Sequence, residues 1–151
     1  MTPFRLFRVL AIAEAITWTL LIAGLILRAV AGLDVAVTIG GGIHGFVFLS
    51  YGATAVLVAI NQRWSFGVGA IAVVSAIVPY ATIPVDVWLT RTGRLEGPWR
   101  TAETEDPRDR TWIDRLARWF IARPLVLFGL IALGVVGAFT VLLILGPPGG
   151  R

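Results

Sequence analysis

The sequence predicts an all-α, multi-pass membrane protein: a bundle of four transmembrane helices with one amphipathic helix at the membrane surface. Three observations predict this class. Of the 151 residues, 57% are hydrophobic and only 15% are charged, whereas a soluble domain is about 45–50% apolar and about 25% charged. The mean hydropathy is +0.84. Several apolar segments are also long enough to cross ~30 Å of hydrocarbon as a helix, which takes about 20 residues.

The predicted spans occupy residues 6–28, 39–60, 64–89 and 122–146. The first three form a membrane core over residues 1–89, and the short links between them predict that neighbouring spans run antiparallel. A strand assignment fails because the segments are far longer than barrel strands and lack alternating inward and outward side chains.

The first span has an alternative interpretation as a signal peptide. Arg5 and Arg8 resemble the basic region of such a peptide, and Ala29-Val30-Ala31 resembles a cleavage site. The apolar run, however, is longer than the usual hydrophobic region, and Glu14 would lie inside it. The sequence therefore favours a span that is retained.

The long link after the third span is the main water-exposed part of the predicted protein. Residues 90–109 are rich in Gly, Pro, Thr and charged side chains, which predicts a loop. Asp106-Pro107 is typical of a helix start. Residues 110–121 follow with apolar side chains on one helical face and charged side chains on the rest, which is typical of a helix in the membrane interface. Residues 147–151 are predicted to be a disordered tail.

Four residues of this amphipathic helix are candidates for contact with the bilayer. Tryptophan favours the membrane interface, and arginine pairs with anionic lipid. The candidates are Trp112, Trp119, Arg115 and Arg118. An alternative is that the apolar face packs on a soluble partner. The pI near 11.0 would also suit nucleic acid, but the composition leaves too little water-facing surface for that partner.

The distribution of arginine predicts an orientation in the bacterial cytoplasmic membrane. With four spans, both termini lie on one side and the link 90–123 lies on the other. The link carries the excess of Arg, and Arg-rich loops are cytoplasmic. We therefore expect the link inside and both termini outside, although the flanks of the first span, Arg5 and Arg8 against Arg28, favour the opposite.

Ionisable side chains inside the spans are the candidate functional residues, because a charge there costs roughly 2.5–3.5 kcal/mol. The predicted spans hold Glu14, His44 and Asp86. Depth along antiparallel helices places His44 and Asp86 near the same membrane face, with Arg28 beside them, so we expect a cluster of these three. The alternative is that Asp86 reaches interfacial water beside Arg91.

Glu14 is the deeper group and has three interpretations. It is a neutral carboxyl that bonds neighbouring helices, a proton-carrying or ligand-binding group, or the partner of Arg8 or Arg63. Tyr51 follows His44 by seven residues, so we expect both side chains to face the same interior.

The second predicted span also carries a stripe of small residues. Gly41 and Gly45 form a G-x-x-x-G pair, and Gly52 continues the stripe. Such a stripe lets helices approach closely. It predicts a helix-packing surface, used either in a homo-oligomer or with another membrane protein.

The residue inventory argues against several chemistries. The chain has no Cys and a single His, so thiolate chemistry is excluded and neither a metal site nor a cofactor is expected. No nucleophile–base set is visible, which disfavours an enzyme.

Three segments of the sequence resemble a known family. The first span contains FRLFRVLAIAEAITWTLL, the second begins with GGGIHGFVF, and the third ends with PYATIPVDVW. These segments resemble the small bacterial "integral membrane domain" family of unknown function, over about residues 3–89. The residues that match its pattern are Arg8, Glu14, His44, Gly45, Pro79, Tyr80, Thr82 and Asp86. The resemblance implies a three-span core with a C-terminal extension, and it implies no activity.

Two functional hypotheses follow. The favoured one is a non-enzymatic accessory or assembly subunit that works through helix packing. The alternative is a small oligomeric transporter, coupled to a proton or solute, that uses Glu14 and the His44/Asp86 region. A membrane enzyme acting on lipid ranks last, because no nucleophile–base set accompanies these residues.

Overall fold

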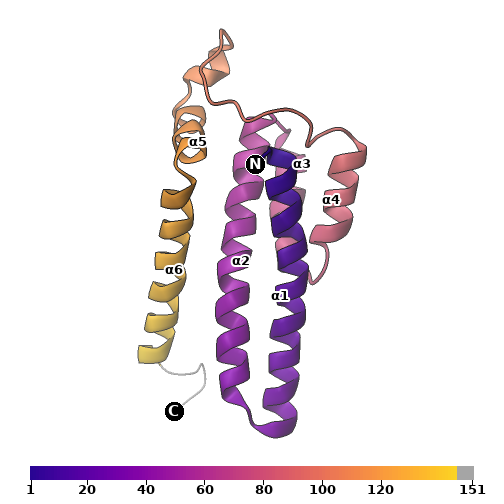
Figure 1. The fold of residues 1–151 in the computed structure, drawn as a ribbon, viewed down its shortest axis with the longest axis vertical. Coiled ribbons are helices and arrows are strands. Elements are labelled where there is room, and N and C mark those ends of the chain that lie inside the picture. Colours follow the sequence, from indigo (N-terminus) through magenta and orange to yellow (C-terminus); the bar gives the residue numbers. More distant parts are fainter. Residues whose placement is uncertain (146–151) are drawn as a thin grey trace.

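The structure, a computed structural model, describes residues 1–145 and is all-α over that range, as predicted. Its centre is an antiparallel pair of long helices, α1 (Pro3–Ala31) and α2 (Asp34–Asn61) (Figure 1). The helix α1 begins where the Thr2 side chain accepts a hydrogen bond from the Arg5 N–H, an N-cap. It ends at Gly32, whose φ of +66° suits glycine. The chain therefore reverses within a tight link.

Close approach of α1 and α2 depends on two glycines that the sequence analysis did not select. A Cβ added to Gly24 would lie 2.8 Å from the Ala36 carbonyl oxygen, and one added to Gly40 would lie 3.1 Å from that of Leu20. At the predicted positions Gly45 and Gly52, an added Cβ would meet no atom within 4 Å.

Gly45 and Gly52 of the predicted stripe therefore do not form the close contact between α1 and α2. There the backbones meet at Gly24 and Gly40 instead. A role for the stripe between molecules stays a prediction.

The predicted third span, residues 64–89, is not one helix, and this corrects the sequence analysis. It consists of α3 (Phe66–Val74), the short helix η1 (Ser75–Ile77) and α4 (Thr82–Arg91). The contacts that this segment makes with α1 move first towards the middle of α1 and then back towards its start. The Trp18 indole bonds the Ala76 carbonyl, whereas Thr82 bonds the Ala11 carbonyl, nearer the start of α1. The segment is a helical hairpin whose two ends lie at the N-terminal end of the bundle (Figure 1).

Backbone chemistry explains the reversal. Val78 precedes Pro79 and is extended, with φ −100° and ψ 123°, because a proline disfavours helical geometry in the residue before it. Tyr80 then adopts a positive φ of 65°. Pro84 falls in the first turn of α4, where its missing N–H leaves no helical bond unmade. The two prolines, Pro79 and Pro84, therefore border a turn between α3–η1 and α4.

The C-terminal part consists of η2 (Pro107–Arg110), α5 (Trp112–Ala122) and α6 (Pro124–Leu145). The helices α5 and α6 are bent by 95° relative to each other. Among the residues that the structure describes, α1 and α2 are the helices that are by themselves long and apolar enough to cross a membrane, and α5 with α6 adds a third candidate if the bent pair is one span. The described residues therefore contain two or three candidate spans, and the prediction of four is not confirmed. Residue 146, the end of the predicted fourth span, and the tail 147–151 lie outside the described residues.

The loop between α4 and η2 is anchored to the end of α2. Arg100 donates to the carbonyls of Ile60 and Asn61, each at 2.7 Å. The Asn61 side chain in turn donates to the Pro98 carbonyl and accepts from the Arg100 N–H. These bonds satisfy carbonyls that the helix end leaves open, and they fix where α5 begins.

Candidate functional site

Glu14 lies on the buried face of α1 and contacts two polar side chains. The Thr17 hydroxyl is 3.4 Å from Glu14 Oε2 and donates to the Glu14 carbonyl at 3.0 Å. His44 of α2 places Nδ1 3.1 Å from Thr17 Oγ1 and 3.8 Å from Glu14 Oε2. A carboxyl, a hydroxyl and an imidazole from two facing helices therefore meet at one point.

Aromatic rings enclose this cluster. The Trp18 ring lies 4.5 Å from the His44 ring, centroid to centroid, and the Phe48 ring lies 6.0 Å from it. Helical spacing explains the arrangement: residues three or four positions apart share a face, so Thr17 and Trp18 lie beside Glu14, and Phe48 lies beside His44. Glu14 is fully buried and His44 is 8% exposed.

One carboxyl oxygen has no hydrogen-bond partner. Glu14 Oε1 is buried and unpaired, whereas Oε2 contacts Thr17 and His44. A carboxylate can accept several hydrogen bonds, so the group keeps unused bonding capacity. The cluster therefore combines an acid and a base within reach of one proton, in a place where an isolated charge is unfavourable.

The sequence predicts both members of this pair as candidate functional residues, but not their contact with each other. The predicted second span begins at residue 39, so His44 would lie about five residues inside. The helix α2 begins at Asp34, which moves His44 roughly 7 Å deeper at ~1.5 Å per residue. That shift brings it to the level of Thr17 and Glu14. Trp18 was missed, although its position four residues after Glu14 was the available signal.

The predicted cluster of Arg28, Asp86 and His44 does not form. Arg28 pairs with Asp34 across the α1–α2 turn at 2.9 Å. Asp86 instead accepts from Arg8 Nε at 3.0 Å, and Arg8 also donates to Thr90. The reason is the hairpin, which carries α4 back towards the N-terminus of α1.

Tyr51 faces the interior as predicted from the spacing, and there it contacts the hairpin. Its hydroxyl lies 3.1 Å from the Ala72 carbonyl and 3.0 Å from the Ser75 hydroxyl, and its ring packs on Phe7. Together with the bond from Trp18 to Ala76, it bonds carbonyls near the point where α3 breaks. Tyr51 therefore holds the end of the hairpin against α1 and α2.

The four predicted membrane-contact residues of α5 have different environments. Trp112 and Trp119 are 68% and 42% exposed, and Arg115 is also exposed. Arg118 instead turns inward and donates to the Asp109 carbonyl at 2.6 Å. Contact of the first three with lipid stays a prediction, whereas Arg118 is occupied within the chain.

Asp109 is the centre of an ion-pair network outside the long helices. Its buried carboxylate accepts from Arg63 at 3.0 Å and from Arg100 at 2.5 Å. Hydrogen bonds from the Thr104 side chain and backbone, together with those two guanidinium groups, hold the pKa of Asp109 well below its usual value. Hydrogen bonds from Arg108 likewise lower the pKa of Asp106 to about 2.

Taken together, the long apolar helices and the buried acid–base pair define an all-helical protein with two or three candidate membrane spans. Residues 4–91 match the family described as a domain of unknown function (DUF3817), and the chain belongs to this family. The resemblance over residues 3–89 is thereby confirmed.

One relative extends this finding. A Streptomyces coelicolor protein, named as a "Putative membrane protein", is 40% identical over 105 residues. The aligned part is 68% of this chain but 12% of the relative, so the chain spans only a small part of that protein's length. No solved structure matches the chain.

Proposed function

We propose that this chain is a proton-coupled membrane protein whose working site is the Glu14–His44 pair. The observation that carries the proposal is a fully buried carboxyl with one unpaired oxygen, 3.8 Å from an imidazole on the facing helix. Ionisable groups inside a membrane are costly and are retained mainly for function.

The pair is suited to hold a single exchangeable proton. With one proton between them, the two groups are either both neutral or a compensating ion pair, and both states have no net charge. Adding or removing a proton leaves an uncompensated charge in a dry environment, so the pair titrates as a unit. Proton exchange would therefore be linked to a change in what surrounds the site.

The depth of the pair and the broken helix beside it support a coupling role. Glu14 lies 11 residues after Pro3, or roughly 17 Å along α1, near the middle of this 29-residue helix. The helix α3–η1 ends beside Trp18, which packs on His44. In many transporters, helices interrupted near the midplane form the coupling site.

Proton flux into liposomes tests the proposal. Purified protein would be reconstituted with a pH-sensitive dye inside, and a pH gradient applied. Glu14→Gln keeps the shape and removes the acid, so flux should fall to that of empty liposomes. Glu103→Gln makes the same chemical change at an exposed loop position and should match the unaltered protein. Equal flux from Glu14→Gln and the unaltered protein would remove the basis of the proposal.

A second candidate function is an accessory or assembly subunit that acts through helix packing. Two observations favour it: the stripe positions Gly45 and Gly52 are open within the chain, and the Streptomyces coelicolor relative carries a similar segment inside a far longer protein. Purification from native membranes in mild detergent should then recover a partner or a homo-oligomer. Gly45→Leu should release it, because the new side chain would project from the open position.

We also propose that the N-terminus and the link 90–123 both face the cytoplasm, in a bacterial cytoplasmic membrane. The hairpin places both at the same end of the bundle. Within residues 1–145, every Arg except Arg28 belongs to that end. This arrangement satisfies the positive-inside rule at the first helix and at the link together, which a four-span topology does not.

A further inference from the structure

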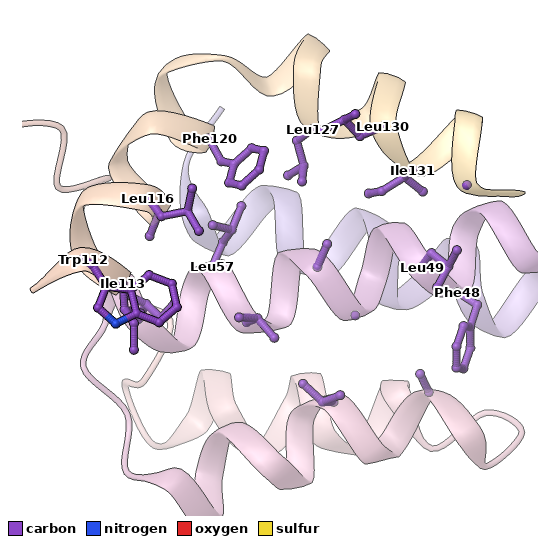
Figure 2. A pocket seen from close by; sticks show the side chains of 18 residues that line it. Phe48, Leu49, Leu57, Trp112, Ile113, Leu116, Phe120, Leu127, Leu130 and Ile131 are labelled. Carbon is purple, nitrogen blue, oxygen red and sulfur yellow. The ribbon is translucent and has the colours of Figure 1, made fainter.

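An apolar groove lies between α2 and the arm formed by α5 and α6; of the residues described at the proton site, Phe48 also lines it (Figure 2). Its volume is about 840 Å³. In Figure 2, Leu57 of α2, Leu116 and Phe120 of α5, and Leu127 and Ile131 of α6 surround it. Among the described side chains that line it, none is charged.

A second lobe of about 690 Å³ adjoins this groove, between α2, α3 and η2. The lobes share four lining residues: Val56, Ile60, Val73 and Ile113. The second lobe differs from the first at one end, where two arginines, Arg63 and Arg108, contribute to the wall together with one acidic residue, Asp114, and the hydroxyl residues Ser65 and Thr111. The combined cleft is therefore forked, apolar along its length and basic at the end that carries the N-terminus.

We propose that this cleft binds one anionic phospholipid, with an acyl chain in each lobe and the phosphate at the Arg63–Arg108 end. The length fits an acyl chain. The α2 wall runs from Phe48 to Ile60, or roughly 18 Å at ~1.5 Å per residue. Half of a ~30 Å hydrocarbon layer is about 15 Å, so the cleft spans about one leaflet.

Charge at the basic end favours an anionic headgroup. Four arginines contact three aspartates there, which leaves an excess of one positive charge; the residues are Arg63, Arg100, Arg108 and Arg118 with Asp106, Asp109 and Asp114.

Two features of the wall favour a phosphate, although Arg108 also donates to Asp106 from Nε and Nη2. The Arg108 side chain is 65% exposed, and guanidinium groups bind phosphate with charge-assisted hydrogen bonds. The Ser65 side chain makes no capping bond to the start of α3, so the positive end of that helix dipole adds to the attraction.

A partner helix fits the cleft less well than a lipid. Such a helix is ~10 Å across and crosses the whole bilayer. At the basic end, α5 forms one wall of the groove and is bent by 95° from α6. The acyl chains of a phospholipid would end at the level of this bend, and the headgroup of the lipid would continue into the membrane interface.

Native mass spectrometry of the full chain in mild detergent tests the proposal. The protein would be incubated with equal amounts of phosphatidylglycerol and phosphatidylcholine. We expect one retained phosphatidylglycerol per chain, favoured over phosphatidylcholine by roughly tenfold, as for one charge-assisted contact. Arg108→Gln should reduce that preference towards parity.

Two leucine variants on the same helix separate groove occupation from general effects. Gly52 lines the groove, and Gly45 is not among the lining residues; neither has an atom within 4 Å of an added Cβ. Gly52→Leu should therefore fill the groove and lose the lipid, whereas Gly45→Leu should keep it. Circular dichroism would confirm that both variants retain their helix content.

Three results would overturn the proposal: equal retention of the two lipids, retention in Gly52→Leu at the level of Gly45→Leu, or a lipid-free dimer. The last would assign the groove to a second copy of the chain. Because none of these variants alters Glu14 or His44, the outcome is independent of the proton site.

Discussion

Arg8 of α1 and Asp86 of α4 form an ion pair that joins the start of the chain to the returning arm of the hairpin. Arg8 Nε lies 3.0 Å from Asp86 Oδ2, and the Asp86 side chain is 8% exposed against 39% for Arg8. The acid is therefore the buried partner and depends on the base. Arg8 also packs over the Phe4 ring, 4.4 Å from its centroid.

Replacing Arg8 alone should destabilise the hairpin more than replacing both Arg8 and Asp86. Arg8→Ala leaves a buried carboxylate without its partner, which costs about 1–3 kcal/mol. Adding Asp86→Asn to that variant should recover part of the loss, because a neutral amide is less costly to leave unpaired. Denaturant unfolding in detergent micelles, run as a double-mutant cycle, measures the coupling. If the loss in the double variant equals the sum of the losses in Arg8→Ala and Asp86→Asn, the pair contributes nothing.

The hairpin makes a prediction about sidedness that a four-span bundle contradicts. Because the chain contains no Cys, single-cysteine variants report their own position. Thr2→Cys and Thr101→Cys should react with a membrane-impermeant maleimide from the same side, the cytoplasm. Leu33→Cys, in the turn between α1 and α2, should react from the other side. Labelling of positions 2 and 101 from opposite sides would restore a third full span.

The two long helices could be predicted from sequence because hydropathy averaged over about 20 residues is a local property. The hairpin could not be predicted in the same way. A span and a half-depth hairpin have the same composition, and proline is tolerated within spans. Only the extended geometry at Val78 and the positive φ at Tyr80 separate the two, and those depend on packing against α1.

Part of the candidate site could be predicted from the sequence for a related reason. Glu14 and His44 stood out because ionisable groups are rare in apolar helices. To predict that they pair, the first residue of α2 must be known to within one helical turn. Helix boundaries are the least certain feature of a sequence-based prediction. Asp86 was assigned to the wrong partner because its neighbours depend on the path of the whole third segment.

Substituting Gly24 should weaken the α1–α2 contact, whereas the same change at Gly45 should not. A Cβ at position 24 would lie 2.8 Å from a backbone oxygen, so Gly24→Ala must separate the helices, at a cost of about 1–3 kcal/mol. Gly45→Ala meets no neighbour and should stabilise its helix by up to about 1 kcal/mol. Thermal unfolding in the same detergent compares them. A smaller loss of stability for Gly24→Ala than for Gly45→Ala would contradict the close contact between α1 and α2 at Gly24.

Tyr80 should tolerate loss of its hydroxyl better than a change of side-chain shape. Its φ of 65° is a left-handed conformation that β-branched residues adopt poorly. Tyr80→Ile should therefore lose about 1–2 kcal/mol. Tyr80→Phe keeps the shape and removes only an exposed contact with Thr19, which predicts a change within about 0.5 kcal/mol. Similar unfolding midpoints for the two variants would argue against this turn geometry.

The network around Asp109 predicts that acid loosens the link and α5 before the long helices. Hydrogen bonds and guanidinium groups lower the pKa of Asp109, and they lower that of Asp106 to about 2. A carboxyl whose folded pKa lies below its unfolded value of ~3.9 stabilises the folded state above that value. The contribution is lost as the pH falls from about 4 through the folded pKa.

Asp109→Asn isolates this effect, because it leaves Arg63 and Arg100 without the carboxylate that they share. The variant should be less stable than the unaltered protein at neutral pH and should lose less stability between pH 4 and pH 2. The unfolding midpoint in detergent, followed over that range, measures both differences. Glu103→Gln is the matched control, since its pair with Arg110 is long, at 3.6 Å, and both side chains are exposed. If Asp109→Asn and the control lose stability equally on acidification, Asp109 is not the group that titrates.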